Sequence, residues 1–97
     1  METTLGQFIA SKLPGSKLNE WDLAPRSFDF VIKHKAEGLD NDRLKSWVDE
    51  FFRLTHQKHN VDRYLTGTVG LDGKDYTLCI TNHVSVKRIS GTLIQES

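Results

Sequence analysis

The sequence predicts a small α+β domain, in which an antiparallel sheet of three to four strands carries a long amphipathic helix and a short N-terminal helix, in the order α-β-α-β-β-β. Three observations lead to this prediction. Residues 40–59 repeat apolar side chains at helical spacing, residues 28–36 alternate at strand spacing, and an Asp-Gly turn joins two further alternating segments. The chain of 97 residues has the length of a single domain.

The first helix is predicted by its cap. Thr4 and Gln7 have the spacing of a capping box, in which each side chain bonds the backbone of the other. The apolar residues that follow fall on one helical face, namely Leu5, Phe8, Ile9 and Leu13. Pro14 and Gly15 should stop the helix, and Gly6 should make it dependent on packing against the core.

Residues 16–27 are the least regular part of the chain. Leu18, Trp21 and Leu23 could anchor one short helical turn before Pro25. Trp21 is large enough to fill part of the core or to anchor an interface with a partner. We favour burial, and we keep Trp21 among the candidate partner-binding residues.

Residues 28–36 alternate as a half-buried strand does, and Gly38 ends the pattern. The side chains expected to face the core are Phe28, Phe30, Ile32 and His34.

The long helix is predicted from Asp40 to about His59. Asp40 is the expected N-cap, and Leu39 and Leu44 take the positions of a hydrophobic staple. The apolar stripe consists of Leu44, Trp47, Val48, Phe51 and Thr55, and it is broadened by Phe52 and Leu54. Asn60 is a plausible left-handed residue at the C-terminal end.

A hairpin is predicted around Asp72-Gly73, with strands at residues 64–71 and 75–81. In the expected register Leu71 faces Lys74, Val69 faces Tyr76, Gly67 faces Leu78 and Leu65 faces Ile80, with Gly67 leaving room for Leu78. A last strand lies within residues 84–95, and its apolar parity shifts near Lys87-Arg88, which indicates a bulge or a short break.

Composition and charge exclude several classes of protein. Thirteen Lys and Arg residues balance thirteen Asp and Glu residues, so neither a strongly basic nucleic-acid binder nor a strongly acidic tail protein describes the whole chain. Cys79 is the single cysteine, which leaves no intramolecular disulfide and favours a reducing compartment. No apolar run approaches the roughly 18 residues of a membrane helix. We therefore expect a cytoplasmic protein without a membrane partner.

Residues suited to catalysis or metal binding do not form a recognisable motif. His56 and His59 could share a metal with Cys79 and His83, but the predicted register turns Cys79 away from the inward side chains, and no CxxC or HExxH spacing is present. Asp49 and Glu50 are adjacent, so they face different directions on a helix. The sequence predicts a protein that is not an enzyme and that uses no metal or cofactor.

Acidic residues before and along the long helix form one candidate surface for a partner. Spaced carboxylates can imitate the phosphates of DNA, although a helix with acids at its start also follows from its own dipole. Within this set Asp42 and Asp49 should lie on the same side of the helix. The candidate partner-binding residues, with Trp21, are Asp29, Glu37, Asp40, Asp42, Asp49 and Glu50.

Basic residues after the long helix form the alternative surface. They would bind nucleic acid if the end of the helix lay near the last strand, and Tyr64 could then stack on a base. These residues are Arg53, Lys58, Arg63, Lys87 and Arg88.

Three features of the chain suggest a family: its size, its architecture, and a helix that is followed by a short antiparallel hairpin. The helix has the sequence Leu44-Lys45-Ser46-Trp47-Val48-Asp49-Glu50-Phe51-Phe52. Over its full length the chain resembles the small phage-encoded anti-CRISPR proteins that inhibit type I-F surveillance (Csy) complexes in the bacterial host cell. The resemblance implies a protein without a catalytic centre that binds this complex, at the large subunit near the DNA-binding site or at the backbone subunits. It also implies inhibition by DNA mimicry or by exclusion of DNA. The neutral net charge favours local mimicry over a fully acidic surface.

Overall fold

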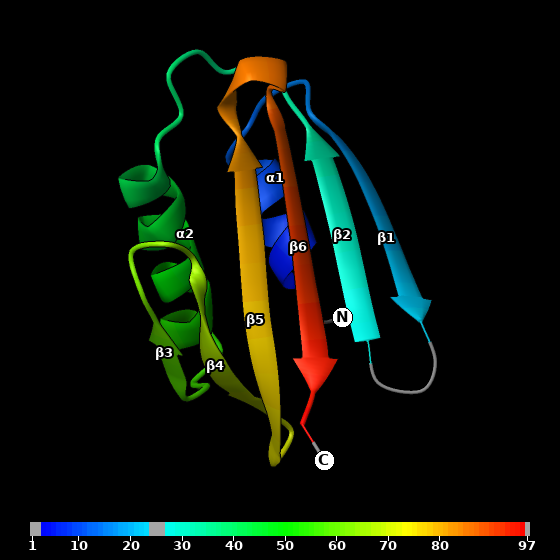
Figure 1. Ribbon diagram of the computed structural model, residues 1–97, viewed down its shortest axis with the longest axis vertical. Coiled ribbons are helices and arrows are strands. Elements are labelled where there is room, and N and C mark those ends of the chain that lie inside the picture. Colours follow the sequence, from blue (N-terminus) through cyan, green and yellow to red (C-terminus); the bar gives the residue numbers. More distant parts are fainter. Residues whose placement is uncertain (1–2, 24–26, 97) are drawn as a thin grey trace.

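A computed structural model describes residues 3–23 and 27–96 (Figure 1). The elements are α1 (Leu5–Ser11), β1 (Lys17–Leu23), β2 (Ser27–Lys33), α2 (Asn41–Leu54), β3 (His59–Val61), β4 (Thr66–Leu71), β5 (Lys74–His83), the 3-10 turn η1 (Val84–Val86) and β6 (Arg88–Gln95). All neighbouring strands are antiparallel, in the order β1-β2-β6-β5-β4-β3. The predicted α+β class is confirmed, but the sheet has six strands rather than three to four.

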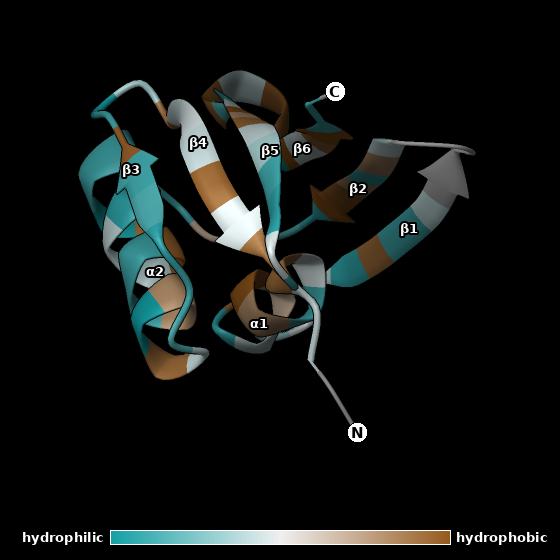
Figure 2. Ribbon diagram, turned by 90° about the horizontal axis from the view of Figure 1, so that it is seen from below, coloured by the Kyte–Doolittle hydropathy of each residue, from teal (hydrophilic) through white to brown (hydrophobic). Residues whose placement is uncertain are grey.

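The two helices lie on the same side of the sheet, which curves around α1 (Figure 2). Side chains that point toward the helices form one continuous core of buried apolar residues. On the opposite face of the sheet, residues 3–23 and 27–96 place no helix. The architecture is therefore two layers, with one sheet face buried and the other open, as antiparallel sheets permit.

The cap of α1 is as predicted. The Thr4 hydroxyl accepts a hydrogen bond from the Gln7 backbone at 3.1 Å, and the Gln7 side chain accepts one from the Thr4 backbone at 3.0 Å. Leu5, Ile9 and Leu13 are buried. The helix ends at Ser11, before the predicted stop at Pro14-Gly15, because its last turn tightens into i to i+3 hydrogen bonds.

The predicted helical turn in residues 18–23 is wrong, because these residues belong to strand β1. Pro25 lies outside the described residues. In the register with β2, Leu18 pairs with the buried Ile32 and packs against the core, whereas Trp21 pairs with Asp29. Trp21 is 40% exposed, so the favoured burial of this ring is also wrong.

Strand β2 keeps the predicted faces, with Phe30, Ile32 and the following His34 buried. It ends at Lys33, three residues before the predicted limit. At its centre the Phe30 ring covers Gly91 of β6, where a Cβ atom would lie 2.3 Å from the ring. Gly91 therefore makes room for Phe30.

Helix α2 begins as predicted and ends earlier. Asp40 caps it by accepting a hydrogen bond from the Arg43 backbone at 2.9 Å. The helix stops at Leu54 rather than near His59, and His56, not Asn60, has the left-handed conformation. Asn60 belongs to β3, a strand that the sequence analysis did not predict.

The buried face of α2 differs from the predicted stripe. Its buried residues are Leu44, Val48, Phe51 and Phe52. Trp47 is only half-buried, with the Arg43 guanidinium 5.4 Å from its ring centroid. Leu54 and Thr55, which the prediction included, are exposed.

The hairpin register is confirmed from Leu71↔Lys74 through Gly67↔Leu78. Leu65 lies beyond the end of β4, where its carbonyl accepts a hydrogen bond from the Ile80 backbone at 2.9 Å. The reason for Gly67 is different from the predicted one. A Cβ atom there would lie 2.0 Å from the carbonyl oxygen of Asn60, so this glycine lets β3 approach β4.

The predicted break near Lys87-Arg88 is confirmed. Strand β5 continues to His83, η1 turns the chain, and Lys87 takes a left-handed conformation with φ of 51°. Arg88 then starts β6, paired with His83 on one side and Lys33 on the other.

Replacing the fully buried Phe52 with alanine should destabilise the protein strongly. We expect Phe52→Ala to lower the free energy of unfolding by about 3–5 kcal/mol, through lost burial and the cavity that remains. Trp47→Ala should lower the free energy of unfolding by clearly less than Phe52→Ala does, because solvent already reaches the Trp47 ring. Urea denaturation followed by circular dichroism measures both, and an equal or larger loss from Trp47→Ala would contradict this packing.

Candidate functional site

The acidic row predicted along α2 is interrupted by a lysine. Asp42 and Asp49 are seven residues apart and share a side of the helix, as expected. Between them lies Lys45, whose ammonium group donates a hydrogen bond to Asp49 at 2.7 Å. The other Asp49 oxygen is 3.5 Å from the His59 ring. Asp49 therefore belongs to a mixed-charge network and not to an uninterrupted row of carboxylates.

Other predicted acidic residues are also engaged within the molecule. Glu50 forms an ion pair with Lys12 of the segment after α1 at 3.3 Å. Asp29, on the open sheet face, accepts hydrogen bonds from the hydroxyl groups of Ser27, at 3.2 Å, and Thr92. These side chains stabilise local structure, and they are less available to a partner than their charges suggest.

Of the acidic residues that the sequence predicted to bind a partner, the exposed ones lie at the start of α2. Glu37, Asp40 and Asp42 are all exposed, and we call them the α2 carboxylate cluster. Glu37 accepts a hydrogen bond from the Lys87 ammonium, which lowers the pKa of the Glu37 carboxyl group. Asp40 contacts the helix backbone as its N-cap, and Asp42 lies in the first turn. Both carboxylates are therefore favourably placed near the positive end of the helix dipole.

The five predicted basic residues lie on separate surfaces. Arg53 and Lys58 lie near the β3 edge, and the Arg63 guanidinium donates a hydrogen bond to the Tyr64 hydroxyl at 2.9 Å in the loop after β3. Lys87 and Arg88 lie at the start of β6, which β5 and β4 separate from β3. Two intervening strands correspond to about 14 Å. The end of α2 therefore does not lie beside the last strand, as the nucleic-acid hypothesis required.

The open sheet face carries two basic residues, Lys17 and Lys33, that the sequence did not single out, beside Arg88, which it did. Lys17 of β1 and Lys33 of β2 are register partners, and Lys33 also pairs with Arg88. All three side chains are exposed. Residues 17–21 lack a strand-like apolar alternation, because Glu20 takes an inward position and Trp21 an outward one, so the sequence pattern did not indicate this pairing.

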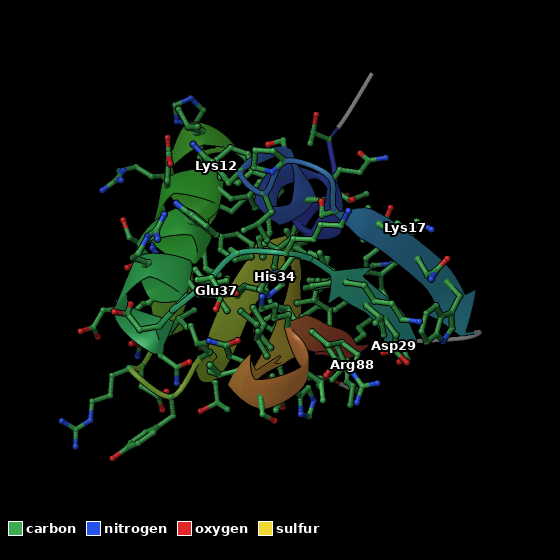
Figure 3. All side chains as sticks on the ribbon, turned by 90° about the horizontal axis from the view of Figure 1, so that it is seen from above. Lys12, Lys17, Asp29, His34, Glu37 and Arg88 are labelled. Carbon is green, nitrogen blue, oxygen red and sulfur yellow. The ribbon has the colours of Figure 1, made fainter. Side chains whose placement is uncertain are left out.

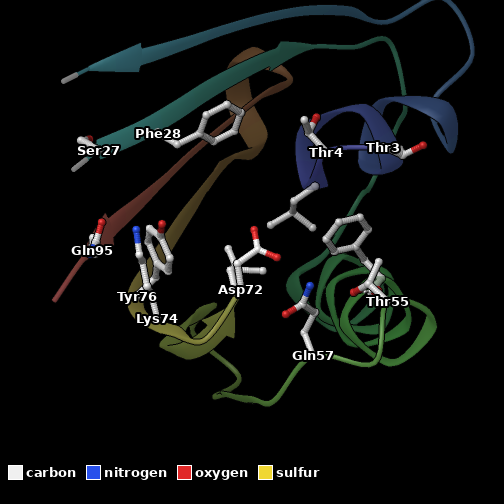
Figure 4. Close-up of a pocket in the computed structure, with 13 residues that line it drawn as sticks. Thr3, Thr4, Ser27, Phe28, Thr55, Gln57, Asp72, Lys74, Tyr76 and Gln95 are labelled. Carbon is white, nitrogen blue, oxygen red and sulfur yellow. Dashed lines mark hydrogen bonds between the residues drawn. The ribbon is translucent and has the colours of Figure 1, made fainter. Parts of the chain in front are cut away.

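A cavity of about 810 Å³ lies at the end of the molecule where α1 begins (Figure 4). Phe28 and Tyr76 line it from the sheet, and Thr55 and Gln57 line it from the chain after α2. A second hollow of about 300 Å³ lies between α2 and β3, beside Asp49 and His59.

The candidate metal ligands are dispersed. His59 stacks on Phe52 with ring centroids 5.7 Å apart, whereas Cys79 is exposed on β5, as its register predicted. In residues 3–23 and 27–96, no group of three or more His, Cys, Asp or Glu side chains is arranged to hold a metal ion.

In comparisons with known proteins, no family model, curated protein or solved structure matches this chain. Over the described part of the chain, no helix has the length and apolar character needed to cross a membrane.

His34 is a buried titratable group beside the start of β6 (Figure 3). Its Nδ1 atom accepts a hydrogen bond from the Ala36 backbone at 3.1 Å, so the ring proton lies on Nε2, for which the described residues provide no hydrogen-bond partner. Burial, and then the positive charge of Lys87, lower the pKa of His34 below its usual 6.5.

The lowered pKa of His34 predicts a loss of stability in acid. The unfolded chain takes up a proton on this residue near pH 6.5, whereas the folded protein resists it. The free energy of unfolding should therefore be fully retained above pH 6.5 and fall as the pH drops below that value. His34→Asn keeps an acceptor for the Ala36 N–H and removes the titration. The difference between the urea midpoints at neutral and at acidic pH should be smaller for His34→Asn than for the unmodified protein. An equal difference in the two proteins would contradict the assignment of this pH dependence to His34.

Proposed function

We propose that the protein is a phage-encoded inhibitor that binds a type I-F CRISPR surveillance complex and prevents target DNA from binding. The observation that carries the proposal is the exposed α2 carboxylate cluster, Glu37, Asp40 and Asp42, at one end of the molecule. A partner that holds DNA must present a basic groove, and exposed carboxylates complement such a groove. The resemblance of the whole chain to type I-F inhibitors favours this partner over other DNA-binding complexes.

The mode of inhibition follows from how few carboxylates remain accessible. Lys45, Lys12 and Lys87 engage Asp49, Glu50 and Glu37 respectively, so imitation of a long run of free phosphates is not available along α2. The α2 carboxylate cluster would direct the protein to the basic groove. The bulk of the domain would then exclude the duplex sterically. The protein acts in this proposal by binding and without a chemical step.

Charge reversal at the cluster tests the proposal. Glu37→Lys combined with Asp42→Lys should weaken binding to the purified surveillance complex by about tenfold or more, equivalent to about 1.4 kcal/mol. Asp40 is kept because it caps α2. The fold should be retained, since exposed charges contribute little stability. Size-exclusion co-elution and binding of labelled target duplex by the complex measure the effect.

The matched control reverses two exposed carboxylates elsewhere, Asp75→Lys with Glu96→Lys, and produces the same change in net charge. This control should still block target binding. Equal losses from the two double variants would show that net charge, and not the α2 carboxylate cluster, governs binding. Failure of the unmodified protein to co-elute with the complex would contradict the proposed function itself.

A further inference from the structure

The open face of the sheet carries a row of cationic side chains that crosses three strands. Lys17 of β1, Lys33 of β2 and Arg88 of β6 are successive register partners, and Arg88 pairs in turn with His83 of β5. We call Lys17, Lys33 and Arg88 the cationic row. Arg88 lies on the side of the sheet away from both helices (Figure 3). Strand pairing, and not chance proximity on a loop, holds these charges side by side.

This arrangement costs stability in the free protein. Like charges directly opposite each other on paired strands are destabilising. Among the described residues, no carboxylate lies within ion-pair distance of the cationic row, whereas Lys12, Lys45 and Lys87 each have such a partner. An anionic ligand would remove the repulsion between the three side chains.

The rest of the face suits a nucleic acid strand with accessible bases. Trp21 is exposed on β1, on the same face as Lys17 and four residues along the strand, or about 13 Å away. Between them and across the face lie polar side chains, among them Asn19, Ser90 and Thr81. Sheet surfaces that combine cations with an aromatic ring can hold phosphates and stack a base.

A duplex fits this face poorly, because reading its grooves requires a protruding helix or strand ribbon. We propose that the open sheet face binds single-stranded nucleic acid, with phosphates on the cationic row and a base stacked on Trp21. This inference goes beyond the proposed function. It rests on side chains outside the α2 carboxylate cluster, so either proposal can fail without the other.

Fluorescence anisotropy of a short fluorescein-labelled oligothymidine tests the proposal. Three phosphate contacts predict that the logarithm of the binding constant falls with the logarithm of salt concentration at a slope of about −2. Lys33→Ala with Arg88→Ala should reduce affinity by about tenfold or more and bring the slope to about −0.7. Trp21→Ala should weaken binding by about tenfold while leaving the slope unchanged.

The matched control is Arg53→Ala with Lys58→Ala, which removes the same charge near the β3 edge. It should bind the oligonucleotide as the unmodified protein does. A second variant, Asp29→Asn, removes the negative charge beside Trp21 and should strengthen binding. Thermal midpoints at or above that of the unmodified protein show that the cationic-row variant remains folded.

Three results would overturn the proposal. The first is no anisotropy change with oligothymidine at about 50 mM salt, where phosphate contacts are strongest. The second is an equal loss in the control and the cationic-row variant. The third is tighter binding to phosphatidylserine vesicles than to the oligonucleotide, which would assign the face to a membrane. Val84 and Val86 of η1 are exposed beside Arg88. Because exposed apolar side chains next to a cation also suit a lipid surface, the vesicle measurement tests the membrane alternative directly.

Discussion

The packing of Phe30 between two glycines sets the spacing of the whole structure. Its ring covers Gly91 of β6, and its Cβ atom would lie 3.2 Å from a Cβ atom placed on Gly6 of α1. Gly91 is therefore needed for the Phe30 ring to lie over β6, and a side chain at Gly6 would require its neighbours to shift by a few tenths of an ångström. The remaining core residues fill the layer that this distance defines, because an interior packed at crystal-like density leaves little freedom elsewhere. The destabilising effect of Gly6 within a helix is offset by this contact.

Local signals predicted much of the fold. The Thr4–Gln7 cap and the Asp72-Gly73 turn depend only on near neighbours in the chain, so the sequence contained their geometry. Strand β1 was missed because Glu20 places a carboxylate on the inward face. That carboxylate accepts a hydrogen bond from the Thr4 hydroxyl at 2.6 Å, a tertiary contact that periodicity cannot reveal. Strand β3 has only three residues, too few to show a period.

The candidate site was harder to predict than the fold, because charge is local whereas its neutralisation is tertiary. Glu37 and Lys87 are 50 positions apart, yet they form an ion pair. The same applies to Lys17, Lys33 and Arg88, which become neighbours only through the strand order. The sequence identified which residues carry charge. The topology determined which charges are neutralised, and it placed Lys17, Lys33 and Arg88 side by side on the open face of the sheet.

The position of β6 has a consequence for how the chain folds. This strand inserts between β2 and β5, and it pairs Phe28 with Leu93 across most of the sequence. The β1–β2 and β4–β5 hairpins can form early from local contacts, but they remain separate until β6 joins them. Closing so long a loop is entropically slow. During synthesis, the inner faces of both hairpins therefore stay exposed until β6 has left the ribosome, and association between nascent chains competes with folding in that interval.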